Sequence, residues 1–289
     1  MSLVNKSWNH NYLETNGVKL HYVSEGEGKL MLMLHGFPEF WYSWRHQIAA
    51  FSNNYRVVAP DLRGYNYSDK PQSIQSYSIS ELVKDVAGII TNLGYKKCNL
   101  VAHDWGGAIA WYFADQYPEM VEKLIILNLP HPAKFMEGLR TPQQLKKSWY
   151  IFFFQLPFLP ELLFKRNDYQ AITSAFTKHT IDESAFTSED IEAYKKAAAQ
   201  PSALTAAINY YRCFFRELFK PQKSWNKINI PTLIVWGEND IYLGKELTYR
   251  TDDYVENLTI KYIPNCSHWV QQEQPELVNQ YIADFLDLS

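Results

Sequence analysis

Short apolar segments of strand length alternate with helical patterns along most of this 289-residue chain. Strands that are almost continuously apolar are typical of a sheet buried on both faces, with the intervening helices as crossovers. The alternation therefore predicts an α/β fold with a mostly parallel sheet flanked by helices, preceded by a hairpin whose turn is Asn16-Gly17. The expected strands are 30–34, 56–59, 98–102, 123–129, 232–236 and 259–263, and the expected helices are 80–93, a segment after Gly107, and 275–286.

The strand pattern lapses between about residues 133 and 221, where the sequence becomes helical, aromatic and charged. Because no flexible linker or low-complexity tract borders this segment, we expect it to pack over a cleft in the rest of the chain. We therefore predict a core of residues 1–132 and 222–289 with an inserted helical cap of residues 133–221.

Within the expected cap, residues 148–164 are rich in Trp, Tyr, Phe and Leu. This composition indicates either an apolar lining for a hydrophobic substrate or the ordinary core of the cap. A membrane span is not expected, because polar residues and prolines interrupt a segment that is already shorter than roughly 20 residues.

Asp104 lies where the strand-like run 98–102 meets a small-residue turn and a helix-like segment. This strand–turn–helix context is that of a nucleophile elbow, which presents one side chain at the top of a sheet. A carboxylate there is already ionised at neutral pH and forms an alkyl ester by attacking a saturated carbon that carries a leaving group. The motif predicts an epoxide or an alkyl halide as substrate, the simpler alternative being that Asp104 is only a helix cap.

Two further residues complete the nucleophile–acid–histidine order of elbow hydrolases. Asp240 follows the apolar run 232–236, and His268 follows the run 259–263. Because parallel strands place their carboxyl ends at one edge of the sheet, both side chains are expected to converge on Asp104. The alternatives are a turn residue for Asp240 and a surface or helix-capping histidine for His268.

At this point the chain resembles the α/β-hydrolase fold, most closely its epoxide hydrolase branch. The residues that carry the resemblance are His35-Gly36-Phe37-Pro38-Glu39, Asp61-Leu62-Arg63-Gly64-Tyr65, His103-Asp104-Trp105-Gly106-Gly107, Asn209-Tyr210-Tyr211-Arg212 and Ser267-His268-Trp269. They are spread over nearly the whole chain. The family usually has Gly where Ser267 stands, a departure that could alter the approach of the histidine loop.

The resemblance implies a cis peptide bond before Pro38 and an oxyanion hole made by the backbone N–H groups of Phe37 and Trp105. An opened epoxide leaves as a basic alkoxide that needs acidic O–H donors, and a tyrosine, with a pKa of about 10, supplies them while staying protonated. By local context Tyr150 and Tyr211 match the ring-opening pair of the family, and Tyr210 is a competitor for the second role. Phe37, Trp105, Tyr150 and Tyr211 are all expected to contact the substrate.

Two other functions stay open. A haloalkane dehalogenase would use the same Asp104, with Trp105 as a halide donor, but many of those enzymes have an Asn amide where this chain has Phe37. Related enzymes also carry their acid after the sixth strand, where Asn128 stands here, and an amide cannot supply the charge. A ligand-binding protein without catalysis would need none of the catalytic set.

The remaining composition predicts a cytoplasmic enzyme that acts on a small hydrophobic molecule. A net charge of −3 without a Lys/Arg run offers no footprint for nucleic acid. Three cysteines without metal-ligand spacing predict reduced thiols, and residues 1–10 lack the apolar core of a signal peptide. The mechanism needs no metal or organic cofactor, and either a monomer or a homodimer is compatible with the sequence.

Overall fold

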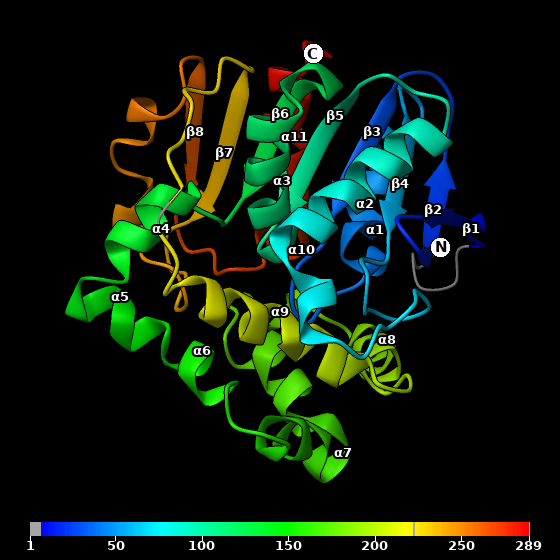
Figure 1. Ribbon diagram of the computed structural model, residues 1–289. Coiled ribbons are helices and arrows are strands. Elements are labelled where there is room, and N and C mark those ends of the chain that lie inside the picture. Colours follow the sequence, from blue (N-terminus) through cyan, green and yellow to red (C-terminus); the bar gives the residue numbers. More distant parts are fainter. Residues whose placement is uncertain (1–6, 222, 289) are drawn as a thin grey trace.

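The computed structural model describes residues 7–221 and 223–288, which form an eight-stranded sheet with helices on both faces (Figure 1). The strand order is β1-β2-β4-β3-β5-β6-β7-β8. Strands β3 to β8 are parallel to one another. Strands β1 and β2 form an antiparallel hairpin, and β2 also pairs antiparallel with β4. The strands are β1 His10–Thr15, β2 Val18–Glu25, β3 Leu30–Leu34, β4 Arg56–Pro60, β5 Cys98–His103, β6 Val121–Leu127, β7 Thr232–Gly237 and β8 Leu258–Ile263.

The sheet agrees with the predicted α/β fold and differs from the expected ranges mainly at β6. This strand spans Val121–Leu127 instead of 123–129. Asn128 has a φ of +39°, which ends the extended conformation and turns the chain toward the cap helices. At the hairpin, Asn16 and Gly17 both have positive φ, as the two-residue turn that was predicted requires.

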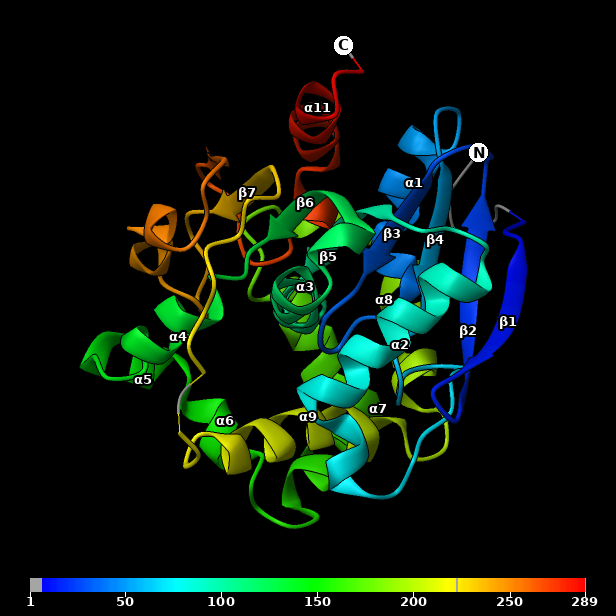
Figure 2. The same cartoon turned by 45° about the horizontal axis from the view of Figure 1, so that its top comes forward.

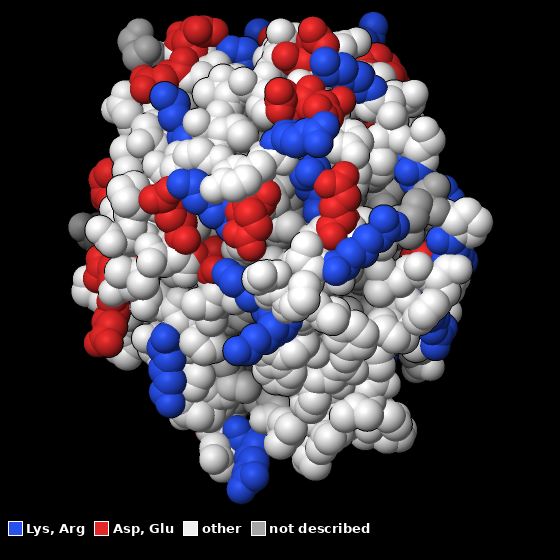
Figure 3. Space-filling view, turned by 90° about the vertical axis from the view of Figure 1, so that its left-hand side faces the viewer, with Lys and Arg blue, Asp and Glu red and all other residues white. Residues whose placement is uncertain are grey.

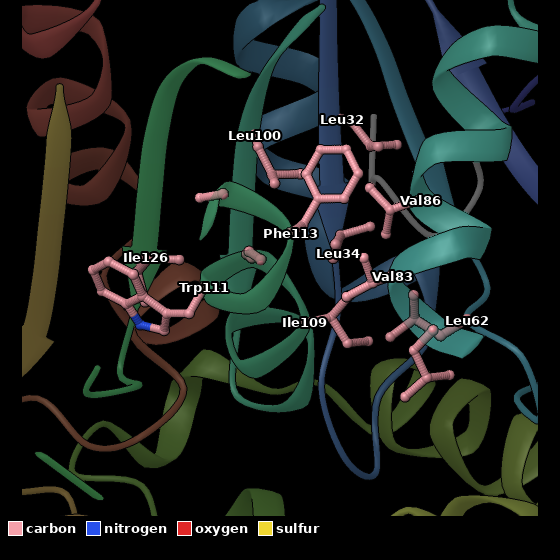
Figure 4. Packing of buried hydrophobic residues seen from close by; sticks show 14 of the residues in the cluster. Leu32, Leu34, Leu62, Val83, Val86, Leu100, Ile109, Trp111, Phe113 and Ile126 are labelled. Atoms are coloured by element: carbon pink, nitrogen blue, oxygen red, sulfur yellow. The ribbon is translucent and has the colours of Figure 1, made fainter. Parts of the chain in front are cut away.

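Helices cover both faces of the sheet, and successive residues of one strand pack in opposite directions. On β3, Leu32 and Leu34 face α2 and α3 (Figure 4), whereas Met31 and Met33 belong to the second apolar cluster, which contains residues of α1 and α11. The strand is fully buried because apolar side chains are needed on both sides. The flanking helices are α1 Arg45–Phe51, α2 Ile79–Asn92, α3 Trp105–Gln116, α10 Val270–Glu273 and α11 Pro275–Phe285.

Between β6 and β7 the described residues form six α-helices, which lie beyond the carboxyl ends of the parallel strands (Figures 1 and 2). Helix α7 is broken at residues 166–169, where the backbone leaves helical dihedrals. The six helices, called the cap helices below, are α4 Pro132–Gly138, α5 Pro142–Lys147, α6 Trp149–Phe153, α7 Leu159–Thr177, α8 Ser188–Ala198 and α9 Ala203–Glu217. Short 3₁₀ segments complete the fold: η2 Trp41–Trp44, η3 Ile74–Tyr77, η4 Pro118–Met120, η5 Glu183–Ala185, η6 Lys245–Thr248 and η7 Thr251–Asp253.

Within residues 7–221 and 223–288, every helix is too short or too polar to traverse a lipid bilayer.

Candidate active site

Asp104 occupies a strained turn between β5 and α3. Its φ of 48° and ψ of −121° are uncommon for a residue with a side chain, and such strain persists only where the surrounding structure enforces it. Two glycines make room for the turn. A Cβ on Gly36 would lie 2.4 Å from the Asp104 Cβ, and a Cβ on Gly106 would lie 2.2 Å from the carbonyl oxygen of Leu34. The small residues around Asp104 are therefore a steric requirement of this turn.

The Asp104 carboxylate is held between a backbone donor and a histidine. The Phe37 N–H donates to Oδ1 at 2.7 Å, and the Phe37–Pro38 bond is cis, as the resemblance implies. On the other side, His268 Nε2 lies 3.6 Å from Oδ2. Burial disfavours the charged carboxylate, but His268, the charge of His103 and the Phe37 N–H together lower the pKa of Asp104 below its ordinary value. Asp104 is thus an ionised carboxylate at neutral pH.

Of the two backbone donors predicted for an oxyanion hole, Phe37 already contacts the carboxylate. Trp105 is the first residue of α3, and among the described residues its N–H makes no hydrogen bond to the Asp104 side chain. An N–H at the first position of a helix has no partner within the helix. It therefore remains available to an oxygen bound beside Asp104.

His268 is anchored by Asp240, as the order of motifs predicted. His268 Nδ1 lies 2.6 Å from Asp240 Oδ2, and both side chains are almost fully buried. Burial opposes the charged imidazole, but the carboxylates of Asp240 and Asp104 raise the pKa of His268 to about 10. Burial likewise opposes the charge of Asp240, yet His268 and Asn128 lower the pKa of Asp240 below its ordinary value. The resting site thus contains an imidazolium between two carboxylates.

Asn128 has a role that sequence reasoning missed. Its Nδ2 donates to Asp240 Oδ2 at 2.7 Å, and its Oδ1 accepts from the Gly237 N–H at 2.8 Å. The sequence shows Asn128 as the place where an acid is absent, yet the amide binds the oxygen that holds His268. Its position directly after a buried strand was the available signal.

Tyr150 and Tyr211 come from different cap helices and meet above Asp104. Tyr150 lies on α6 and Tyr211 on α9, and their ring centroids are 5.7 Å apart. The Tyr211 hydroxyl oxygen accepts a hydrogen bond from the Trp105 indole N–H, but among the described residues neither phenol proton has a protein acceptor. Burial and the nearby Asp104 charge raise the pKa of each hydroxyl well above its ordinary value, so both remain proton donors.

Tyr210, the competitor, points its hydroxyl elsewhere. It donates to the carbonyl oxygen of Arg63 at 2.7 Å, and the side chain is fully buried. Tyr210 therefore ties α9 to the core, whereas the adjacent Tyr211 keeps a free proton.

A cavity of about 290 Å³ lies between Asp104 and the helices α6 and α9. Asp104 and Trp105 line it from the core, and Tyr150 and Tyr211 line it from the cap. Most of the remaining lining is apolar, including Leu129, Phe135, Met136, Ile151, Phe214 and Leu218. The cavity thus combines an apolar wall with a few convergent polar groups, as small-molecule sites do.

A buried polar network formed by Glu39 and His103 lies next to Asp104. The fully buried Glu39 accepts from His103 Nδ1 at 2.8 Å and from the Gly36 N–H at 2.9 Å, while His103 Nε2 lies 2.9 Å from the carbonyl oxygen of His268. Because a carboxylate and a carbonyl both accept, both His103 nitrogens must donate when Glu39 is ionised. The network links the turn before Phe37, the nucleophile elbow and the histidine loop.

Ser267 stands where the resemblance leads one to expect Gly, and its hydroxyl is fully used. It donates to Glu273, which also accepts from the backbone N–H groups of Ile181 and Asp182, beyond α7. The departure therefore adds a link between the histidine loop and the cap helices, and His268 still reaches Asp104.

No cluster of three or more His, Cys, Asp or Glu side chains that could hold a metal ion occurs within residues 7–221 and 223–288.

Comparison with known proteins places the chain in a family. The model of the alpha/beta hydrolase fold matches residues 29–275. Human epoxide hydrolase 4 is 48% identical over 284 residues, covering 95% of this chain and 77% of that protein. The AB hydrolase superfamily protein YfhM of Bacillus subtilis is 43% identical, covering 95% of this chain and 96% of that protein.

Solved structures give the same relationship. An epoxide hydrolase from Bacillus megaterium, in complex with an inhibitor, superposes with a TM-score of 0.91 at 40% identity, covering 96% of this chain and all of that one. The epoxide hydrolase VrEH1 from Vigna radiata gives a TM-score of 0.86 at 32% identity, covering 97% of this chain and 98% of that one. This chain is therefore a hydrolase that belongs to the α/β-hydrolase family and, within it, to the epoxide hydrolase branch.

Proposed function

We propose that this protein hydrolyses a hydrophobic epoxide to a vicinal diol through a covalent ester on Asp104. The observation that carries the proposal is the pair of phenol protons without protein acceptors, on Tyr150 and Tyr211, in the same cavity as an ionised carboxylate. An alkoxide leaving group needs such donors, whereas a halide does not.

Ring opening is the first step. Tyr150 and Tyr211 donate hydrogen bonds to the epoxide oxygen, and Asp104 Oδ2 attacks one ring carbon while Phe37 holds Oδ1. One carbon–oxygen bond forms and one breaks, and the alkoxide takes a proton from a tyrosine. Because the nucleophile is already ionised, this step needs no base.

Ester formation prepares the base for the second step. In the resting site the charges of Asp240 and Asp104 both raise the pKa of His268. When Asp104 becomes an ester its charge disappears, so the pKa of His268 falls and the imidazolium releases its extra proton, which restores the tyrosine. The neutral His268, oriented by Asp240, then draws a proton from water.

Ester hydrolysis returns the enzyme to its starting state. The activated water attacks the carboxyl carbon of Asp104, and the Phe37 and Trp105 N–H groups stabilise the oxyanion that forms. The intermediate collapses, the carbon–oxygen bond to the substrate breaks, and the diol leaves with the proton held by His268. The carboxyl proton that remains on Asp104 then passes to His268, which restores the carboxylate and the imidazolium. No group other than water enters the reaction.

We also propose that residues 133–221 act as a cap on a core of residues 1–132 and 222–289. In support, the cap helices contribute the two donors and much of the apolar wall, while the core contributes the nucleophile, acid and base. A cytoplasmic setting is part of this proposal, because Cys98, Cys213 and Cys266 are buried and unpaired.

The His268→Gln variant tests the division of labour. It should open the ring and then fail to hydrolyse the ester, so intact-protein mass spectrometry after incubation with styrene oxide should show a gain equal to the whole epoxide. Digestion should localise the adduct to the peptide that contains Asp104. A bromoalkane would instead add its mass less hydrogen bromide, which separates dehalogenation from epoxide hydrolysis.

The matched control is His268→Gln combined with Asp104→Ala, which should form no adduct. A folded, inactive His268→Gln protein without adduct would exclude the covalent route and favour direct attack of water on the epoxide.

A further inference from the structure

One face of the cap helices exposes an unusual density of large apolar side chains. Of the fifteen large hydrophobic residues that are exposed in the described part of the chain, seven lie within residues 148–164. Phe158 is 83% exposed, Leu162 65% and Trp149 62%. Scattered apolar residues are normal on a protein surface, but a contiguous group marks an interaction site. The seven residues are Trp149, Phe152, Leu156, Phe158, Leu159, Leu162 and Leu163.

Ring contacts extend this face from α6 to the end of α9. The Phe152 ring centroid lies 5.8 Å from that of Phe215, which lies 5.3 Å from that of Phe219. Phe219 is 77% exposed. We call the seven residues together with Phe215 and Phe219 the apolar cap face. Figure 3 shows a broad uncharged area over the lower part of the molecule, where Figure 1 places the cap helices.

The unpaired charges around the apolar cap face are positive. The two carboxylates nearby, Asp168 and Glu217, are each paired with a lysine, Lys195 and Lys220 respectively. Glu161 is the sole charged residue within 148–164, and it is buried against Arg212 at 2.8 Å. The neighbouring cations are exposed, and among the described residues they have no carboxylate within ion-pair distance. These cations are Lys146, Lys165, Arg166 and Arg216. An apolar surface bordered by unpaired positive charge is complementary to an anionic lipid headgroup layer.

Helices α6 and α9 contribute to the apolar cap face and also line the catalytic cavity on their inner side. Tyr150 and Ile151 of α6 and Phe214 of α9 face the cavity, while Trp149, Phe152 and the Phe215–Phe219 pair lie on the exposed side. The aromatic segment, for which the sequence left open a pocket lining or ordinary cap core, therefore has an inner side and an exposed side. Only its inner side serves the cavity.

We propose that the apolar cap face docks on the surface of an anionic phospholipid bilayer, with the aromatic and leucine side chains in the headgroup–acyl boundary. This contact brings the helices that border the cavity to the layer in which an apolar substrate is most concentrated. A second copy of the chain fits less well, because a two-fold interface would bring the basic borders of both copies together.

Co-sedimentation with vesicles tests the docking. The full chain should bind vesicles of phosphatidylcholine and phosphatidylglycerol at 7:3 more tightly than vesicles of phosphatidylcholine alone, and high salt should reduce the difference. The double variant Phe158→Ser/Leu162→Ser should bind about tenfold more weakly to both. Lys165→Glu/Arg166→Glu should lose the preference for anionic lipid while keeping the residual apolar binding.

Tyr249→Ser is the matched control, because Tyr249 is 54% exposed and lies between η6 and η7, outside the cap helices. It should bind like the unaltered chain. Every variant should keep the thermal unfolding midpoint and the turnover of a short, water-miscible epoxide. This turnover arm rests on the proposed function, whereas the binding arm does not, so the two fail separately.

Three results would overturn the docking proposal. The first is that the unaltered chain binds neither kind of vesicle. The second is that the Phe158→Ser/Leu162→Ser protein binds as well as the unaltered chain. In the third, light scattering finds a dimer that this double variant dissociates, which would assign the face to a subunit contact.

Discussion

The two halves of the site hold their functional groups by different means. In the core, Asp104, Asp240 and His268 are fixed by polar contacts. The Asp240 carboxylate, for example, accepts hydrogen bonds from the Asn128 side chain and from the backbone N–H groups of Tyr242 and Leu243. In the cap, Tyr150 and Tyr211 are held mainly by aromatic packing, edge-to-face between the two rings and tilted between Tyr211 and Phe154, and their phenol protons have no acceptor among the described residues.

This difference matches the chemistry that each half performs. Covalent attack and water activation need atoms placed within a few tenths of an ångström, which a charged hydrogen-bond network provides. A proton donor to an epoxide needs a hydroxyl whose proton is not already bound, and aromatic packing holds the two rings without using that proton. We therefore expect changes in the core to affect either the attack that opens the ring or the hydrolysis of the ester, and changes in the cap to affect mainly ring opening.

The largest effect should follow loss of the nucleophile. Asp104→Ala should lower turnover of an aryl epoxide by at least about 10⁴-fold, because no ester can form. The fold should survive, since the strained turn at Asp104 accommodates a smaller side chain. Steady-state kinetics and circular dichroism check both points, and substantial activity in the variant would refute the assignment.

Loss of a cap donor should be smaller and confined to ring opening. Tyr150→Phe or Tyr211→Phe should each slow this step by a factor on the order of 10²–10⁴, and the double variant should nearly abolish it. Single-turnover kinetics separate the steps, because hydrolysis of a preformed ester should be unaffected.

Tyr210→Phe is the matched control for the cap, since its hydroxyl is bound to Arg63. It should lower stability by about 1–3 kcal/mol, because the change leaves a buried carbonyl without its donor, and it should leave ring opening nearly unchanged. If instead Tyr210→Phe slowed ring opening and Tyr211→Phe did not, the second donor would have been assigned to the wrong residue.

Sequence reasoning reached the fold and the core of the site because both follow from local patterns. Apolar runs located the sheet, and the turns that follow two of these runs contain Asp104 and Asp240. It could not find the role of Asn128, since a hydrogen bond to a residue 112 positions away leaves no local trace. Nor could it divide residues 148–164 into inner and outer sides, because α6 ends at Phe153 and α7 begins at Leu159, so no continuous helical periodicity runs through this range.

A substitution of Asn128 should test the comparison between core and cap, with a moderate loss of stability. Asn128→Ala removes one donor from Asp240 and leaves the buried Gly237 N–H without an acceptor, which should lower stability by about 1–3 kcal/mol. With His268 less firmly oriented, ester hydrolysis should slow by about tenfold while ring opening keeps its rate. Equal slowing of both steps in single-turnover experiments would mean that Asn128 acts only on the fold.

The last prediction concerns the dependence of stability on pH. The ordinary pKa of histidine is near 6.5, and Asp240 and Asp104 raise the pKa of His268 to about 10 against the opposing effect of burial. A group whose pKa is raised by folding stabilises the protein fully below its unfolded pKa and loses that contribution as pH rises through its folded pKa. The free energy of unfolding should therefore fall between pH 7 and 10, by up to about 1.4 kcal/mol per pH unit from this group. His268→Gln lacks the group and retains the buried tyrosines and cysteines, so its unfolding free energy, measured by denaturant titration across this range, should depend less on pH. Parallel curves for the two proteins would show that the imidazolium between the two carboxylates is not the resting state of the site.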